Sequence, residues 1–291
     1  MRSSSSKVIL FLSDIHIGSI YAPCSPKPYI AKTDTYWNPS KLQKKLYSYW
    51  LWVKDQLTQA PYIVCVNGEP IDGDNYKETG GSTWTTDIND QLKEAAKLLQ
   101  TYRPKHLLMT RGSGYHVRKN NTEFEDTLCE LMKLERYSIY NRDYTKSQLW
   151  DSHHAHNVID DILNFSVNDK VFNVTHHIGY NRAYHNKSQA LTAELANMEF
   201  MRGKYWKSKD FPSVIVRGHV HYFVEVRFAR IRGFTCPTFK ISADKFMTRK
   251  GLPDPASLGA IEVIVESNGK ILVEPHIVAN TDYPKHEILR L

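Results

Sequence analysis

Histidines and carboxylates directly follow five short apolar segments of this 291-residue chain. The five motifs read Asp14-Ile15-His16, Asn67-Gly68-Glu69-Pro70-Ile71-Asp72, Arg111-Gly112-Ser113-Gly114-Tyr115-His116, Thr175-His176-His177 and Gly218-His219-Val220-His221. Imidazole and carboxylate groups are the ligands that manganese, iron and zinc accept in proteins. Since residues i and i+2 of an extended segment point the same way, each Asp-x-His or His-x-His pair can face one site. The sequence therefore predicts a metal centre.

The segments that precede these motifs predict buried strands at 8–12, 62–66, 107–110, 171–175 and 213–217. Between them the apolar spacing predicts helices that begin at Asn38, at Thr86 or Asp87, and at a capping box of Thr122 and Glu125; a further helix is expected over 188–202, ending at Gly203. Beyond residue 136 the strands are expected to be more antiparallel, and Asn268-Gly269 predicts a type I′ hairpin. In open α/β sheets, ligands bind beyond the carboxyl ends of the strands, where all five motifs fall.

Taken in order, the motifs resemble the calcineurin-like metallophosphoesterase superfamily. The resemblance extends from Asp14 to His221 and follows the pattern Asp-x-His, Gly-acid-x-x-Asp, Gly-…-His, His, Gly-His-x-His. It implies an α/β fold, a four-layer αββα sandwich of mixed sheets, with a dinuclear metal site at the strand C-termini. It also implies the ligands: Asp14, His16 and His221 for the first metal, His176 and His219 for the second, and Glu69 as the bridge.

The same resemblance implies a hydrolytic mechanism and its cofactors. A water or hydroxide between two divalent ions, ~3.5–4 Å apart, would attack phosphorus in line. Manganese is the expected metal, with iron, zinc, nickel or magnesium as alternatives.

The chain departs from the family at two motifs. Glu69 stands where the bridging residue is usually aspartate, and its extra methylene moves the carboxylate by roughly an ångström, a change to which catalysis is sensitive. Asp72 remains as a support for the ligands or as a substitute ligand. The usual Gly-Asn-His-Asp/Glu is replaced by Gly112-Ser113-Gly114-Tyr115-His116, so the asparagine ligand is missing, and Ser113 or a water would fill its position.

The resemblance implies that His116 takes the family's histidine role, in which it would stabilise the phosphoryl oxygens or protonate the leaving group. The GSGYH loop looks like a GTPYH-type variant of phage-encoded members, and the stretch Thr85 to Asn89 is similar to that group too. This suggests a phage-encoded protein in a bacterial host.

Three further residues of the motifs have two interpretations each. Arg111 binds phosphate or caps a strand, and Tyr115 stacks on a base or forms a wall of the pocket. His177 either packs behind His176 or replaces it as the ligand, and His176 is the expected one.

Composition excludes several classes of protein. With 41% apolar and 24% charged residues the chain is neither disordered nor fibrous, and no run approaches the ~20 apolar residues of a membrane span. No secretory signal is recognised, and the four cysteines form no CxxC pair, which fits a cytoplasmic protein without a membrane partner. We expect one domain over 1–291, with a disordered tail at 1–6 and insertions at 18–37 and 73–85.

The expected function is that of a metal-dependent phosphoric ester hydrolase. The excess of 38 basic over 31 acidic residues and the polar insertions favour a phosphodiesterase or nuclease that acts on nucleic acid or nucleotide diesters. A phosphomonoesterase, acting on a protein or a small molecule, is the first alternative. A non-catalytic metal-binding scaffold is the second, because of Glu69 and the missing asparagine.

Overall fold

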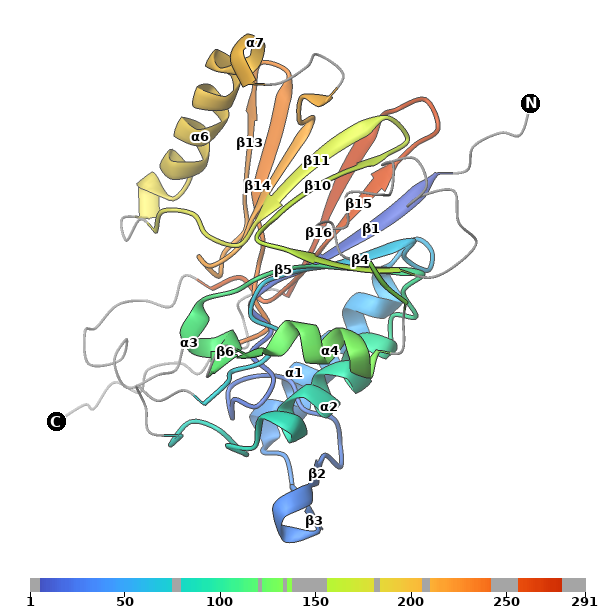
Figure 1. The fold of residues 1–291 in the computed structure, drawn as a ribbon, viewed down its shortest axis with the longest axis vertical. Helices are drawn as coiled ribbons and strands as arrows, with labels where there is room; N and C mark the ends of the chain where they lie inside the picture. Colours follow the sequence, from blue (N-terminus) through green and yellow to red (C-terminus); the bar gives the residue numbers. More distant parts are fainter. Residues whose placement is uncertain are drawn as a thin grey trace, which may run out of the picture.

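The computed structural model describes residues 6–74, 80–119, 122–132, 135–137, 156–180, 184–205, 210–241 and 256–278. Two β-sheets lie face to face, with helices on both outer sides (Figure 1). The first sheet has the order β16-β15-β1-β4-β5-β9-β8, formed by Ile271–Ile277, Gly259–Val265, Lys7–Leu12, Ile63–Asn67, His106–Thr110, His156–Asp160 and Glu135–Tyr137. The second has the order β10-β11-β12-β14-β13, formed by Ile162–Val167, Lys170–Thr175, Val214–Arg217, Ile231–Thr235 and Val224–Phe228.

The centre of the first sheet is parallel, which brings several strand ends to one edge. β1 pairs in parallel with β4, β4 with β5, and β5 with β9, while β15 runs antiparallel to β1. All residues of β4 and β5 are buried, as expected for strands covered on both faces. The motifs after β1, β4 and β5 therefore meet at the same edge.

The second sheet is mixed, and here the expectation of mainly antiparallel strands is only half right. β10 and β13 are antiparallel edge strands, but β11, β12 and β14 are mutually parallel. The connection from β11 to β12 contains helix α6 (Gln189–Phe200), and a crossover of this kind returns the chain in the same direction. The carboxyl ends of β11 and β12 consequently lie together as well.

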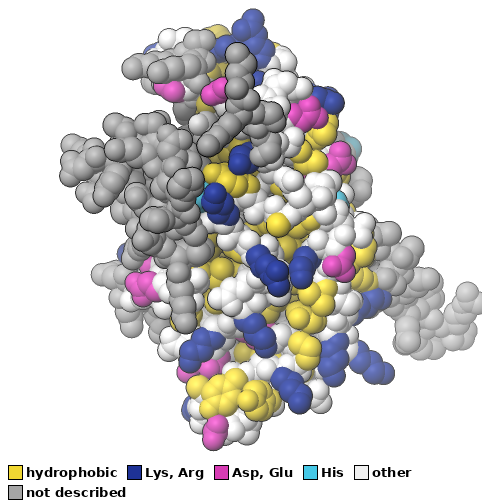
Figure 2. Space-filling view, turned by 90° about the vertical axis from the view of Figure 1, so that its right-hand side faces the viewer, with side chains coloured by type: hydrophobic (Ala, Val, Ile, Leu, Met, Phe, Trp, Pro, Cys, Tyr) yellow, Lys and Arg dark blue, Asp and Glu magenta, His cyan; other side chains and the backbone are white. Residues whose placement is uncertain are grey.

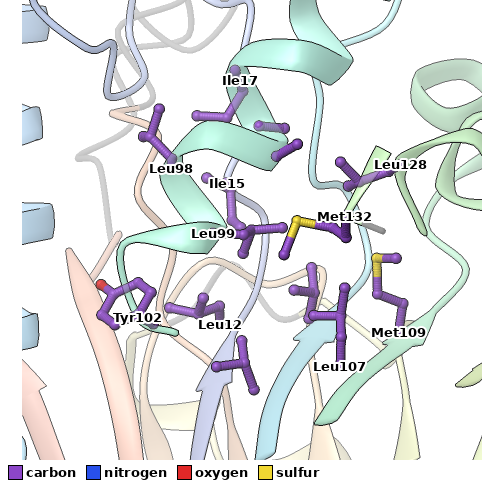
Figure 3. Packing of buried hydrophobic residues seen from close by; sticks show 14 of the residues in the cluster. Leu12, Ile15, Ile17, Leu98, Leu99, Tyr102, Leu107, Met109, Leu128 and Met132 are labelled. Atoms are coloured by element: carbon purple, nitrogen blue, oxygen red, sulfur yellow. The ribbon is translucent and has the colours of Figure 1, made fainter. Parts of the chain in front are cut away.

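Hydrophobic clusters between the layers confirm the four-layer αββα sandwich. Phe11 of the first sheet packs edge-on against Phe234 of the second, with ring centroids 5.4 Å apart. Leu191 and Leu195 of α6 pack against the outer face of the second sheet. On the outer face of the first sheet lie α1 (Lys41–Gln56), α2 (Ile88–Gln100) and α4 (Phe124–Leu131). Figure 3 shows side chains of α2 and α4, such as Leu99 and Leu128, close to Leu107 of β5.

The helix starts agree with the sequence at α2 and differ at α1 and α4. Asp87 caps α2 as expected. Helix α1 is capped by Ser40 and not by Asn38, because Ser40 and Gln43 form a reciprocal capping box. The capping box expected for α4 is wrong, since Glu125 accepts a hydrogen bond from the backbone of the Gly112 loop instead.

Two turn expectations need correction. The hairpin between β15 and β16 forms, but only Gly269 is left-handed (φ 81°), whereas a type I′ turn requires two left-handed residues. Gly203 does not end a helix, because it lies within the short α7 (Arg202–Tyr205) that follows α6.

The structure describes residues 18–37 in full and part of the 73–85 insertion. Residues 18–37 contain a two-stranded hairpin of β2 (Tyr29–Ile30) and β3 (Thr35–Tyr36) around the 3-10 turn Ala31–Thr33. Most of the expected tail and the centre of the 73–85 insertion lie outside the described residues. No helix in the described part of the chain is long and apolar enough to cross a membrane.

Candidate metal centre

The candidate ligands are presented by tight turns at the carboxyl ends of β1, β4, β11 and β12. Five residues in the turns after β1, β4 and β12 have a left-handed backbone, with φ between 50° and 69°: Asp14, His16, Glu69, His219 and His221. This conformation is uncommon for residues other than glycine and is found where the surroundings enforce it, often at functional sites. Backbone hydrogen bonds from Asp14 to Gly68 (3.2 Å) and from His16 to Glu69 (3.0 Å) join the first two turns.

One group of side chains consists of Asp14, His16, Glu69 and His221, whose ligand atoms all lie within 4.8 Å of one another. His16 Nε2 lies 2.9 Å from Glu69 Oε2, and His221 Nε2 lies 3.1 Å from Asp14 Oδ1. A mixed carboxylate and imidazole set of this kind suits a divalent transition metal.

A second group consists of His176, His177 and His219, again within 4.8 Å. Its link to the first group is Glu69, whose Oε1 lies 3.3 Å from His176 Nε2 while Oε2 faces His16. The two oxygens of one buried carboxylate thus face one group each. This is the arrangement that a bridging carboxylate needs.

The hydrogen bonding of the buried atoms at the centre of the cluster indicates whether the cluster suits a cation. Asp14 Oδ1, His16 Nε2 and His176 Nε2 are buried and form no hydrogen bond of suitable geometry with the described residues, although Glu69 and His221 lie within 3.3 Å of them. A buried polar atom without a hydrogen bond lowers the stability of the fold by about 1–3 kcal/mol. Three such atoms that point toward one place therefore indicate that a further group binds there. A divalent cation is the partner that accepts lone pairs from all three, and the residues present fit it.

The outer nitrogens of the two buried histidines are held by hydrogen bonds. His16 Nδ1 donates to Asp72 Oδ1 (3.0 Å), and His176 Nδ1 donates to the backbone oxygen of Asn67 (2.8 Å). A proton fixed on Nδ1 leaves the lone pair of Nε2 for a metal and orients the ring.

Electrostatics favours a cation in the cluster. Burial alone would raise the pKa of Asp14 and Glu69, but the neighbouring imidazoles outweigh it and lower both. Burial would lower the pKa of His176, yet Asp14 and Glu69 raise it to about 9. The carboxylates are therefore ionised and hold a proton on His176, which a metal ion would displace.

Glycines allow the turns to approach one another closely. A Cβ atom at Gly68 would overlap with the ring of His176, and the backbone of Gly68 is left-handed (φ 77°). A Cβ atom at Gly218 would lie 2.5 Å from Ser13 Oγ. Side chains at either position would push His176 away from Glu69.

His116 lies at the side of the cluster, on the short helix α3 (Gly114–Val117). Its Nδ1 donates to the backbone oxygen of Asp72 (2.7 Å), and its ring packs edge-on against His16 at 4.6 Å between centroids. Burial, followed by the charge of His16, lowers the pKa of His116 to about 4. His116 is thus neutral at pH 7, and a proton-donating role requires a bound anion that raises this pKa.

The other residues singled out in the sequence occupy different positions. The backbone N–H of Ser113 donates to Glu69 Oε1 (3.2 Å), and its buried Oγ has no hydrogen-bond partner in the described part of the chain. Tyr115 is half-buried, with its ring 4.0 Å from that of His116. Arg111 lies against Asp126 (3.3 Å) and Glu123 (3.9 Å), so its charge is already balanced by carboxylates. His177 is exposed, whereas His176 is fully buried.

Lys240 is a member of the site that sequence reasoning missed. Its Nζ lies 2.8 Å from Asp72 Oδ1, the same oxygen that accepts from His16. No local motif surrounds Lys240, which is separated from Asp72 by 168 residues, so only the folded chain places them together. Thr238, two residues earlier, donates to the backbone oxygen of Asp14 (2.6 Å) and fixes this segment beside the cluster.

Comparisons with known proteins find solved structures that are similar to this chain at low sequence identity. No protein-family model and no curated protein matches the chain. Among solved structures it is similar to Vacuolar Protein Sorting 29 from Cryptosporidium parvum (11% identity, TM-score 0.43), covering 95% of this chain and 100% of that one. It is also similar to an archaeal phosphodiesterase (12%, TM-score 0.39, 92% and 99%) and to a Staphylococcus aureus structure described as a 5'-nucleotidase (13%, TM-score 0.41, 98% and 56%).

The layered fold agrees with the fold that the resemblance in the sequence implies. Identities and TM-scores this low do not establish an activity. The functional interpretation therefore depends on the geometry of the cluster.

Proposed function

We propose that this protein is a metal-dependent phosphoesterase of the calcineurin-like type, with a phosphodiester of a nucleic acid or nucleotide as its substrate. The observation that carries the proposal is the position of Glu69, with one oxygen facing His16 and the other facing His176. Asp14, His16 and His221 would hold a first divalent ion, and His176 and His219 a second. When bound, such ions polarise a phosphate ester and activate water for attack on phosphorus.

The protein's own residues would position these groups. Asp72 and Asn67 orient the ligand histidines through their Nδ1 atoms. The N–H of Ser113 holds the Glu69 carboxylate, and the buried Oγ of Ser113 is suited to the position of the missing asparagine. His116, with Nδ1 committed to the backbone of Asp72, presents Nε2 to a phosphoryl or leaving-group oxygen.

The choice of a diester substrate is supported by charge. The chain carries a formal net charge of +7, which favours polyanionic ligands. Manganese is the metal we propose to be used, and a phosphomonoester is the competing substrate class. Turnover of p-nitrophenyl phosphate above that of its bis-ester would favour the competing class.

The test combines metal content with turnover. We expect two metal ions per chain by elemental analysis, and manganese-dependent cleavage of bis(p-nitrophenyl) phosphate, single-stranded DNA or RNA. Asp14→Asn should lose metal and turnover together, because it removes a charged ligand. His116→Ala should keep both metals and lower turnover roughly 100-fold or more, the contribution typical of general acid–base catalysis.

A matched control is available on the surface. Asp161→Asn changes an exposed aspartate between β9 and β10 and should alter neither quantity. Stoichiometric metal without turnover of any ester would refute the enzymatic proposal and leave the scaffold alternative. Absence of metal under these conditions would refute both.

A further inference from the structure

A protruding hairpin carries an exposed pair of aromatic rings. Tyr29 of β2 and Tyr36 of β3 are 42% and 66% exposed, and their rings pack against each other with centroids 5.5 Å apart. In Figure 1 this hairpin projects at the lower end of the molecule, below α1 and α2. We call residues 27–37 the aromatic hairpin. The two residues are cross-strand partners, so their contact stabilises the hairpin, and the exposed parts of the rings remain available to a ligand.

The aromatic hairpin is held rigidly. Tyr29 Oη donates to Asp34 Oδ1 (2.7 Å), and the indole N–H of Trp37 donates to Gln43 of α1 (3.2 Å). The backbone N–H of Ala31 donates to both carboxylate oxygens of Asp90 in α2 (3.3 Å each). Rings fixed in this way lose little conformational entropy when a ligand packs on them.

Exposed lysines flank the two tyrosines in the sequence. Four exposed lysines lie on the aromatic hairpin and on the first turn of α1, and among the described residues none of them forms an ion pair with a carboxylate: Lys27, Lys32, Lys41 and Lys44. Asp34 is the acidic residue of this segment, and its side chain is engaged by Tyr29. Figure 2 shows a group of hydrophobic side chains at the lower end of one face, with Lys and Arg side chains above and beside it and a few acidic side chains adjoining it.

We propose that the aromatic hairpin and the first turn of α1 bind single-stranded nucleic acid, with bases against Tyr29 and Tyr36 and phosphates against the four lysines. Rings that stack with bases beside cations that follow the backbone are the combination by which single strands are bound without sequence preference. In a duplex the bases already stack on one another and are not available to these rings. An acidic peptide would be bound by the lysines alone and would leave the rings unused.

The position of the hairpin in the chain connects it to the metal centre. The segment from His16 to Tyr29 is fixed to the site by hydrogen bonds from Asp72 to Ile17 (2.9 Å) and from Trp84 to Gly18 (2.9 Å). Fully extended, this segment would span at most about 45 Å, so one flexible strand can contact both places. The inference rests on the proposed function, because it specifies the class of phosphate ester that the centre receives.

The test measures binding separately from cleavage. A fluorescent single strand of about 20 nucleotides, made with phosphorothioate linkages to resist hydrolysis, is titrated with the full-length protein while anisotropy is recorded. We expect Tyr29→Ala combined with Tyr36→Ala to weaken binding roughly 10-fold or more, and the corresponding double Phe variant to bind as the wild type. Lys32→Glu should weaken binding and flatten its dependence on salt.

An exposed aromatic residue elsewhere on the chain provides the control for this test. Phe200→Ala removes an aromatic side chain of α6 that is 87% exposed, and it should leave the affinity unchanged. Wild-type affinity in the double Ala variant would overturn the proposal, as would failure of the wild type to bind the strand. Competition by an oligoglutamate peptide that is equal in the wild type and the double Ala variant would assign the surface to an acidic protein instead. Hydrolysis of bis(p-nitrophenyl) phosphate by the double Ala variant, unchanged from the wild type, separates this question from the proposed chemistry.

Discussion

In the proposed two-metal centre, Glu69 is the residue that would bridge the two ions. It is buried, its oxygens face His16 and His176, and the backbone of Ser113 donates to one of them. Glutamate occupies this position, whereas aspartate is usual in the metallophosphoesterase superfamily that the sequence resembles. A Cβ atom at position 112 would lie 2.6 Å from the backbone nitrogen of Glu69 and 2.7 Å from its Cγ, so Gly112 leaves the space that the Glu69 side chain occupies.

Replacement of Glu69 tests its charge and its length separately. Glu69→Gln keeps the size but removes the charge, and we expect metal affinity to fall at least about 10-fold, measured by calorimetric titration with manganese. Glu69→Asp restores the usual residue and should keep both metals and at least the wild-type turnover. Two metals bound with unchanged affinity in the Gln variant would exclude Glu69 as the bridge. Loss of activity in the Asp variant would mean that the site is built around glutamate.

Turns at strand ends are the elements that assemble the centre. Their left-handed residues and close-packed glycines place side chains from four strands within a few ångströms. Such turns are intrinsically unfavourable for residues with side chains, and the hydrogen bonds between them, such as Ile15 to Glu69 (3.0 Å), offset that cost.

Substitution of a glycine in one of these turns should damage the centre. Gly68→Ala places a Cβ against the His176 ring in a left-handed backbone, and we expect a loss of about 1–2 kcal/mol or more in the free energy of unfolding, with weaker metal binding. Gly203→Ala is the matched control, because nothing lies within 4 Å of its Cβ and the residue is helical. The control should stabilise the protein by about 0.5–1 kcal/mol, as judged by urea unfolding. Equal effects of the two substitutions would contradict the proposed close approach.

The sequence patterns predicted the positions of individual strands better than the features that depend on contacts between distant segments. Apolar runs followed by Asp-x-His and Gly-His-x-His located β1 and β12 and the residues of the cluster, because those signals are local. The parallel direction of β11, β12 and β14 and the cap at Ser40 depend on contacts between distant or competing segments. Lys240 was missed for the same reason, since its partner Asp72 is defined only by the fold.

At the scale of the whole molecule, the centre joins the two sheets of the sandwich. Asp14, His16 and Glu69 follow strands of the first sheet, and His176 and His221 follow strands of the second. A cation bound by ligands from both sheets would link the two sheets. Anything that binds the folded chain and not the unfolded one stabilises the fold, by ~2.7 kcal/mol at a free concentration of 100 times Kd.

Metal binding should therefore raise the melting temperature, and by more at higher pH. In the metal-free protein the pKa of His176 is raised to about 9, so its stabilising contribution is complete below the unfolded value of 6.5 and is lost as the pH rises to about 9. The metal-bound protein has already released that proton and does not suffer this loss. The gap between the two melting temperatures should widen from pH 6.5 to 8.5 in scanning calorimetry with and without manganese. Asp14→Asn should show no gap at either pH, and a wild-type gap that is constant or narrows with pH would contradict the assignment of His176 as a ligand.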